Sequence, residues 1–314
     1  MSRSFEFINY MVRPNKNVER KLIASSLDKI KFIFSLSKYR YVGFGSMWFT
    51  DFVLFHRLLG ICDMVTIEKE KSREKRVRFN KPFACIDVRM GDASDHLGEL
   101  LEGKNSLTWL DYDGSLENAL NGDILTAVGA MQSGSIILVS VNAMVEQLDG
   151  KTVDGRELTS LEYLEWITET LPLKDAPKRL TRNDFPCLVS EILISAFESA
   201  VFSTMPGCEF FPMWNFLYAD GAKMITVGGM VADSKDRQRL SECYPDGAPT
   251  YFSKTPFEIS LPILTDKEKR ALDTLMPTQK EIKPKSLEFE LRPTEIEAYQ
   301  KFYLEYPIFN ELSA

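Results

Sequence analysis

Residues 39–68 constrain the fold more than any other part of the chain, because they combine a strand, a glycine turn and a helix in a short space. Residues 39–42 (YRYV) are aromatic and β-branched, which is typical of a buried strand. Gly43 and Gly45 then bracket a turn in which the lack of side chains lets a ligand approach the backbone. Residues 48–59 carry apolar side chains at helical spacing, and Gly60 predicts the end of that helix.

A second strand, residues 64–67, follows this helix and places the acidic Glu68 at its carboxyl end. Ligands of open α/β sheets bind at the carboxyl ends of the strands. A carboxylate at this position can accept two hydrogen bonds from the hydroxyl groups of a ribose. Residues 39–68 therefore predict one half of a nucleoside-binding sheet.

Three further strands are predicted downstream. Residues 85–89 lead to Asp92, residues 106–111 end in Asp111, and the apolar residues 135–141 lead to Asn142. Strands that alternate with helices predict a parallel sheet covered on both faces. In a nucleoside site, a carboxylate at the position of Asp92 lies near the adenine and can accept from its exocyclic amine.

Two carboxylates, Asp111 and Asp113, surround the turn at the end of the fourth strand. A purely structural interpretation is a turn in which Asp113 caps the backbone and Gly114 takes a left-handed conformation. The functional interpretation places Asp111 against the ligand and Asp113 toward a substrate. Residues 116–131 are predicted to form one helix after this turn.

A hairpin is predicted near the end of the sheet, because two β-rich runs (209–218 and 222–231) flank the dipeptide Asp220-Gly221. An antiparallel hairpin that closes an otherwise parallel sheet is unlike a dinucleotide-binding dehydrogenase, whose halves stay parallel. The overall prediction is an α/β fold with a mostly parallel, Rossmann-like sheet and an antiparallel C-terminal hairpin.

Composition divides the chain into three predicted parts: a basic helical segment (1–38), an α/β domain (39–232) with a polar insertion (145–185), and a C-terminal appendage (233–314) with two helices. The chain has a net charge of −7, yet residues 1–40 hold nine Lys/Arg against three Asp/Glu. Arg13, Lys16 and Arg20 lie at the start of the first predicted helix. A second basic cluster, residues 69–81, follows Glu68 directly. Both clusters are either solvated surfaces or a rim that attracts phosphate.

Several classes of protein are disfavoured by the sequence. No apolar run is expected to reach bilayer-spanning length, and the N-terminus shows no hydrophobic region typical of a signal peptide. The five cysteines are scattered, without a CxxC pair, which argues against a zinc site and for a reducing environment. We therefore expect a cytoplasmic protein that does not contact a membrane.

The order of these elements resembles the class I S-adenosylmethionine-dependent methyltransferases over residues 39–230. The motifs RPNKNVERK (13–21), YVGFGS (41–46) and WLDYDG (109–114) are more narrowly similar to a bacterial group described as putative O-methyltransferases. The resemblance implies that S-adenosylmethionine is the cofactor, bound by the residues that match the family's motifs: Gly43, Phe44, Gly45, Ser46, Glu68, Asp92 and Asp111. It also implies Asp111 or Asp113 as the catalytic base, with Arg13, Lys16, Arg20 and Asn142 binding the substrate.

Other chemistries match less well. Metal-assisted O-methyltransferases use aspartates after the fourth and fifth strands; Asp111 and Asn142 fit two positions, but Val141 stands where a second aspartate is needed, so no metal is expected. Enzymes that methylate the amino groups of bases often carry a proline loop after the fourth strand, which DYDG lacks. Pro186-Cys187 lies in the wrong segment for a cytosine C5 nucleophile.

Three hypotheses follow. The first is methyl transfer to an oxygen of a small or medium-sized acceptor. The second keeps the cofactor but takes a nucleic acid as acceptor, with the basic segments along its phosphates. The third, motivated by a glycine loop shorter than the family's three-glycine pattern, is a non-catalytic nucleotide-binding or interaction protein. The oligomeric state is left open.

Overall fold

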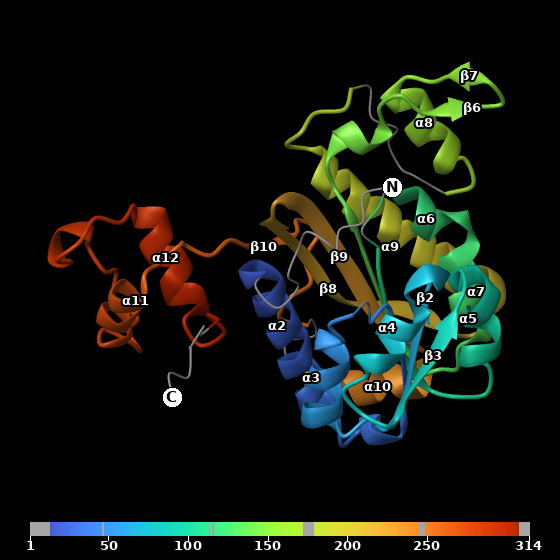
Figure 1. The fold of residues 1–314 in the computed structure, drawn as a ribbon, viewed down its shortest axis with the longest axis horizontal. Helices are drawn as coiled ribbons and strands as arrows, with labels where there is room; N and C mark the ends of the chain where they lie inside the picture. Colours follow the sequence, from blue (N-terminus) through green and yellow to red (C-terminus); the bar gives the residue numbers. More distant parts are fainter. Residues whose placement is uncertain are drawn as a thin grey trace.

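The computed structural model describes residues 13–45, 47–112, 114, 116–171, 179–244 and 249–307. At its centre is an eight-stranded sheet with the strand order β10-β8-β9-β5-β4-β1-β2-β3 (Figure 1). The strands are β1 (Arg40–Gly43), β2 (Asp63–Glu68), β3 (Ile86–Met90), β4 (Ser106–Asp111), β5 (Ile136–Asn142), β8 (Glu209–Asp220), β9 (Ala222–Ala232) and β10 (Phe257–Ile259). A separate two-stranded hairpin joins β6 (Thr152–Val153) and β7 (Arg156–Glu157).

The sheet is parallel from β5 to β3 and antiparallel only around β9. Each neighbouring pair in the order β5-β4-β1-β2-β3 is parallel. β5 is buried along its whole length, as a strand covered on both faces must be. β9 is antiparallel to both β5 and β8, and its hairpin turns at Gly221, whose φ of +110° suits glycine. This topology confirms the predicted fold class.

Helices cover both faces of the sheet and form two buried apolar layers. Tyr41 and Val42 are adjacent in β1 yet belong to different layers, because successive side chains of a strand point to opposite faces. α2, α3 and α10 contribute to the first layer, and α5, α7 and α9 to the second. The helices are α2 (Pro14–Ile30), α3 (Thr50–Leu59), α4 (Glu74–Phe79), α5 (Ala93–Leu101), α6 (Leu116–Asn118), α7 (Ile124–Ala130), α8 (Ser160–Ile167), α9 (Phe185–Thr204), α10 (Ser234–Cys243), α11 (Asp266–Asp273) and α12 (Pro293–Phe302).

Helix α2 is the element that most affects the site, because the sheet itself fixes its first turn. Pro14 occupies the first helical position, where its missing N–H costs nothing. The carboxylate of Asp220, in the β8–β9 turn, accepts from the backbone N–H of Asn15 (3.1 Å) and of Lys16 (2.8 Å). Since a negative charge at a helix N-terminus is favourable, this contact holds α2 against the hairpin.

Two predictions about helices were wrong. The single helix expected over residues 116–131 is broken into α6, a π-helical turn (Ala119–Asp123) and α7, because Gly122 has a φ of +103°. Contrary to expectation, α9 has the length and hydropathy that could span a membrane, judged by length and composition alone. Just over half (56%) of its most apolar window is buried against the rest of the chain.

The C-terminal part continues from β10, and Figure 1 shows α11 and α12 beyond that edge of the sheet. Thr265 caps the start of α11, and the side chains of Thr265 and Glu268 each accept from the other's backbone N–H. The rings of Phe257 and Phe302 lie 6.0 Å apart, and Lys21 Nζ donates to the carbonyl of Glu305 at 2.9 Å. These contacts join the C-terminal helices to β10 and α2. The domain boundaries at 38 and 232 stay predictions.

Candidate active site

The carboxyl ends of five parallel strands lie along one edge of the sheet. β1 ends at Gly43 and lies between β2, which ends at Glu68, and β4, which ends at Asp111. Asp92 follows β3, and Asn142 is the last residue of β5. The structure thus brings these predicted site residues to one edge, where open α/β sheets bind their ligands.

The glycine loop packs closely against neighbouring side chains of the sheet and of the segment before α3. A Cβ atom on Gly45 would lie 2.7 Å from the ring of Phe49 and 2.9 Å from Thr66 Oγ1, and one on Gly43 would lie 2.7 Å from the hydroxyl oxygen of Tyr41. Gly45 N donates to Thr66 Oγ1 at 2.8 Å. Any side chain at either position would displace the loop, so the packing of the loop itself requires both glycines.

Two of the predicted residues, Ser46 and Asp113, lie outside the described residues. Their assignments, as a cofactor contact and as a base, therefore stay predictions.

Phe44, in the glycine loop, packs edge to face on Tyr112, with ring centroids 5.3 Å apart. The hydroxyl of Tyr112 donates to the carboxylate of Asp123, and burial raises the pKa of Asp123 above its ordinary value. Asp123 was missed because a continuous helix was expected there. The dipeptide Gly122-Asp123 could have signalled it, since a glycine at positive φ breaks the helix and frees Asp123 from the regular repeat.

Glu68 and Asp92 lie at the ends of neighbouring strands and are linked through the backbone. The N–H of Gly91 donates to the carbonyl of Glu68 at 3.0 Å, and one carboxylate oxygen of Glu68 accepts from the N–H of Glu70 at 3.3 Å. Asp92 forms an ion pair with Lys69 at 2.6 Å, with both side chains more than half exposed. Such exposed pairs contribute about 0–1 kcal/mol, so a ligand can displace Lys69 at little cost.

Asp111 belongs to a buried polar network centred on Lys16 of α2. Lys16 Nζ lies 2.9 Å from Asp111 Oδ1, 2.9 Å from Glu19 Oε2 and 2.9 Å from the hydroxyl of Tyr218. It also lies 4.5 Å from the centre of the Trp109 ring. The side chain of Lys16 is fully buried, whereas that of Asp111 keeps 20% of its surface exposed. Asp111 is therefore the member of this network that a ligand can reach.

Burial and ion pairing shift the pKa values of this network in opposite directions. Burial alone would lower the pKa of Lys16, but the charges of Asp111 and Glu19 raise it far above its ordinary value. Burial would raise the pKa of Asp111, yet Lys16 and Arg20 hold it below the ordinary range. For Glu19 burial prevails and the pKa is raised despite Lys16. Lys16 and Asp111 are thus both charged at neutral pH.

The predicted basic rim at the start of α2 requires a correction. Lys16 and Arg20 were expected at a surface that attracts substrate phosphates, but both are buried. Arg20 Nε pairs with Asp51 Oδ1 at 3.2 Å, and the other oxygen of Asp51 accepts from the hydroxyl of Tyr41 at 2.9 Å. Arg13, the residue before the helix, is half-buried. The face of α2 that carries these cations is turned toward the sheet, because the acidic strand end attracts it.

Three buried polar atoms on α2 and at the start of α3 have no hydrogen-bond partner among the described residues: Asn17 Oδ1, Arg20 Nη1 and Thr50 Oγ1. Each such atom costs about 1–3 kcal/mol, so a group of them indicates a ligand. A ligand end with both a carboxylate and an ammonium group offers an acceptor to Arg20 and a donor to Asn17. These residues fit the amino-acid end of S-adenosylmethionine.

Asn142 does not project freely from the end of β5. Its side chain is 7% exposed, and its Oδ1 accepts from the N–H of Met144 at 2.9 Å. Asn142 thus shapes the turn after β5. Among the described residues, no three His, Cys, Asp or Glu side chains gather as metal ligands would.

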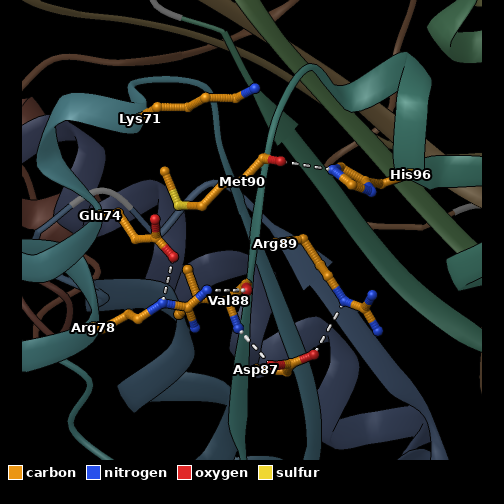
Figure 2. Close-up of a pocket in the computed structure, with 8 residues that line it drawn as sticks. All are labelled: Lys71, Glu74, Arg78, Asp87, Val88, Arg89, Met90 and His96. Atoms are coloured by element: carbon orange, nitrogen blue, oxygen red, sulfur yellow. Dashed lines mark hydrogen bonds and ion pairs between the residues drawn. The ribbon is translucent and has the colours of Figure 1, made fainter.

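A shallow hollow of about 690 Å³ lies on the outer side of β3, the edge strand (Figure 2). Basic side chains close to this hollow cover alternate carbonyls of the strand. Lys81 Nζ donates to Ile86 O (2.8 Å), Arg78 donates to Val88 O (3.2 Å), and His96 Nε2 lies 3.1 Å from Met90 O. These contacts protect an exposed strand edge from pairing with another chain. We therefore do not assign methyl transfer to this hollow.

A match to a known family supports the interpretation of the chain as a methyltransferase. The family described as "Putative O-methyltransferase" matches residues 8–314. No curated protein matches the chain.

Solved structures match with low identity. Trm1 from Pyrococcus horikoshii, in complex with S-adenosyl-L-methionine, is 12% identical with a TM-score of 0.49; the match covers 76% of this chain and 58% of Trm1. Human N-acetylserotonin methyltransferase is 13% identical with a TM-score of 0.37, over 69% of this chain and 52% of the human chain. A putative O-methyltransferase from Klebsiella pneumoniae is 13% identical with a TM-score of 0.35, over 73% and 94%. The chain thus spans less than two thirds of Trm1.

The family match extends over nearly the whole chain. It confirms the family expected from the sequence. The chain belongs to the family described as "Putative O-methyltransferase".

Proposed function

We propose that the chain transfers a methyl group to an oxygen of a small or medium-sized acceptor, at the carboxyl edge of β1, β2 and β4. The observation that carries this proposal is the position of two carboxylates on either side of the glycine loop. Glu68 and Asp111 end the two strands that pair with β1, which itself ends at Gly43. A nucleoside that lies over the loop can therefore contact Glu68, with Asp111 on the other side of the loop.

We place the cofactor along this edge with its adenine toward Asp92, after β3, and its amino-acid end toward α2. Glu68 is placed to accept hydrogen bonds from the ribose hydroxyls, and Asp92 from the adenine amine. Arg20 and Asn17 offer their unpaired atoms to the amino-acid end. Bound there, S-adenosylmethionine supplies an electrophilic methyl group, so the protein mainly has to align the acceptor and exclude water.

Asp111 is the group best placed to receive the proton of the acceptor. It lies at the end of β4, is partly exposed, and is kept ionised by Lys16. A carboxylate with a lowered pKa is a weak base, which disfavours ordinary alcohols. The positive charge of Lys16, 2.9 Å away, favours an acceptor oxygen that is already becoming negative. We infer an acceptor with a weakly acidic hydroxyl, such as a phenol.

The two rival hypotheses receive less support. A nucleic-acid acceptor was expected along both basic segments, but Lys16 and Arg20 at the start of α2 are buried, which leaves only residues 69–81 to contact its phosphates. A non-catalytic scaffold would have no use for the unpaired buried polar atoms of α2 and α3. We propose a cytoplasmic location on the basis of the scattered cysteines.

Calorimetry with S-adenosylhomocysteine tests the cofactor site. Glu68→Ala is expected to weaken binding by about 1–3 kcal/mol, the value of one or two hydrogen bonds. Glu99→Ala is the matched control, because Glu99 is exposed on α5, outside the site, and its loss should leave the affinity unchanged. No binding to the wild-type protein, or equal affinities for all three proteins, would refute the proposal.

A panel of phenols, catechols and aliphatic alcohols with methyl-labelled cofactor tests the acceptor. Transfer to phenolic hydroxyls is expected to exceed transfer to alcohols of similar size. Transfer to aliphatic alcohols alone would contradict the inferred acceptor class while leaving the cofactor site intact.

A further inference from the structure

The segment that follows Glu68 concentrates positive charge on an otherwise acidic protein. Residues 69–81 contain seven Lys/Arg and two Asp/Glu, whereas the whole chain has a net charge of −7. The segment forms a 3₁₀ turn (Lys71–Arg73) and helix α4, which lies beside the edge strand β3. This concentration is not needed by the proposed methyl transfer.

Some of these cations have structural partners and some do not. Lys69 pairs with Asp92, while Arg78 and Lys81 cover carbonyls of β3. Lys71, Lys75 and Arg76 are exposed, and none has an ion-pair or side-chain hydrogen-bond partner among the described residues. Figure 2 marks no interaction between Lys71 and the other labelled residues that line the hollow.

An aromatic ring lies next to the unpaired cations. Phe79, the last residue of α4, is 86% exposed. It follows Lys75 by four residues and Arg76 by three, so the three side chains are neighbours on one helical surface. The ring is therefore available to a partner.

The combination of free cations and an exposed ring fits single-stranded nucleic acid. Such partners offer phosphates to basic side chains and unstacked bases to aromatic rings. An anionic membrane would also attract the cations, but α4 has six residues and is too short to bury an apolar face in a bilayer surface.

We propose that Lys71, Lys75, Arg76 and Phe79 form a binding surface for single-stranded nucleic acid beside the carboxyl end of β2. The three cations contact phosphates, and Phe79 stacks on a base. Binding to this surface requires neither methyl transfer nor the cofactor. A separate measurement therefore tests it.

Fluorescence anisotropy with a labelled 20-nucleotide RNA of mixed sequence, and with the matching DNA, tests the proposal. Replacing Lys71, Lys75 and Arg76 together by Glu is expected to abolish measurable binding at physiological salt. Replacing them by Gln should reduce the log–log slope of affinity against salt by about 2, since each phosphate contact on a single strand contributes about 0.7. Phe79→Ser should weaken binding roughly tenfold with the slope unchanged.

The matched control replaces Lys267, Lys283 and Lys285, three exposed lysines of the C-terminal part, by Glu. It changes the net charge equally and should bind like the wild type. Four results would overturn the proposal: no binding by the wild type, an equal loss in the control, an unchanged affinity after Phe79→Ser, or binding only to phosphatidylserine vesicles. Binding of RNA but not DNA, or of both, supports it and defines the ligand.

Discussion

Lys16 Nζ lies 2.9 Å from Asp111 Oδ1, although 95 residues separate the two in the sequence. This contact joins the first described helix to the end of the central strand β4. It also places a buried ammonium group directly behind Asp111, the most accessible carboxylate of the Lys16 network. The same pair therefore serves both the fold and the electrostatics of the proposed reaction.

Lys16→Met is expected to destabilise the protein by about 3–5 kcal/mol, because it leaves the carboxylates of Glu19 and Asp111 without their counter-charge. Urea unfolding at pH 7 measures the effect. Lys29→Met, an exposed change in the same helix, is the control and should stay within about 0.5 kcal/mol of the wild type. Equal stability of the two variants would show that α2 does not pack on β4 in this way.

Glu19→Gln is expected to change how stability depends on pH. The folded state raises the pKa of Glu19 above the ordinary value of 4.5, so the folded state holds this proton more tightly than the unfolded state. The stability that Glu19 contributes is therefore present below pH 4.5 and is lost as pH rises through the folded pKa. The variant lacks this loss. Its unfolding free energy, relative to the wild type, should increase from pH 4 upward; a difference that stays constant with pH would contradict the assigned pKa shift.

Arg20→Met is expected to distinguish the two ends of the cofactor. If Arg20 Nη1 binds the carboxylate of the amino-acid end, affinity for S-adenosylhomocysteine should fall by about 1.5–3 kcal/mol. Affinity for methylthioadenosine, which lacks that end, should not change. Calorimetry with both ligands gives the ratio of the two affinities. A general loss of folded protein affects both measurements alike and leaves this ratio unchanged. Equal losses for both ligands would assign Arg20 to the structure rather than to binding.

Much of the fold follows from local patterns. The strands, the glycine loop and the Asp220-Gly221 hairpin are each encoded within a few residues, so their periodicity and turn chemistry predict them. Glu68, Asp92 and Asp111 could be predicted for the same reason, since each ends or directly follows a recognisable strand. Parallel strands then bring these residues to one edge.

The rest of the site depends on contacts between distant parts of the chain. Lys16 looks like a surface lysine in sequence, and its burial depends on distant partners such as Tyr218, 202 residues away, and Asp111. Asp123 was not recognised because the sequence predicts a regular helix there, which Gly122 breaks. The capping of β3 carbonyls by Arg78 could not be foreseen either, because basic runs are usually read as solvated.

Asp111→Asn is expected to separate catalysis from cofactor binding. A side chain of the same shape keeps a hydrogen-bond acceptor for Lys16 but cannot take a proton, so methyl transfer to the best phenolic acceptor should fall by about 10²–10⁴-fold. Affinity for S-adenosylhomocysteine should change less than tenfold, because Glu68 and Arg20 remain. Since Lys16 holds the pKa of Asp111 below the ordinary 3.8, the wild-type rate should not fall between pH 8 and pH 5 through titration of this group. Rates that survive the substitution would move the role of base to another residue, and a large loss of cofactor affinity would make Asp111 a binding residue instead.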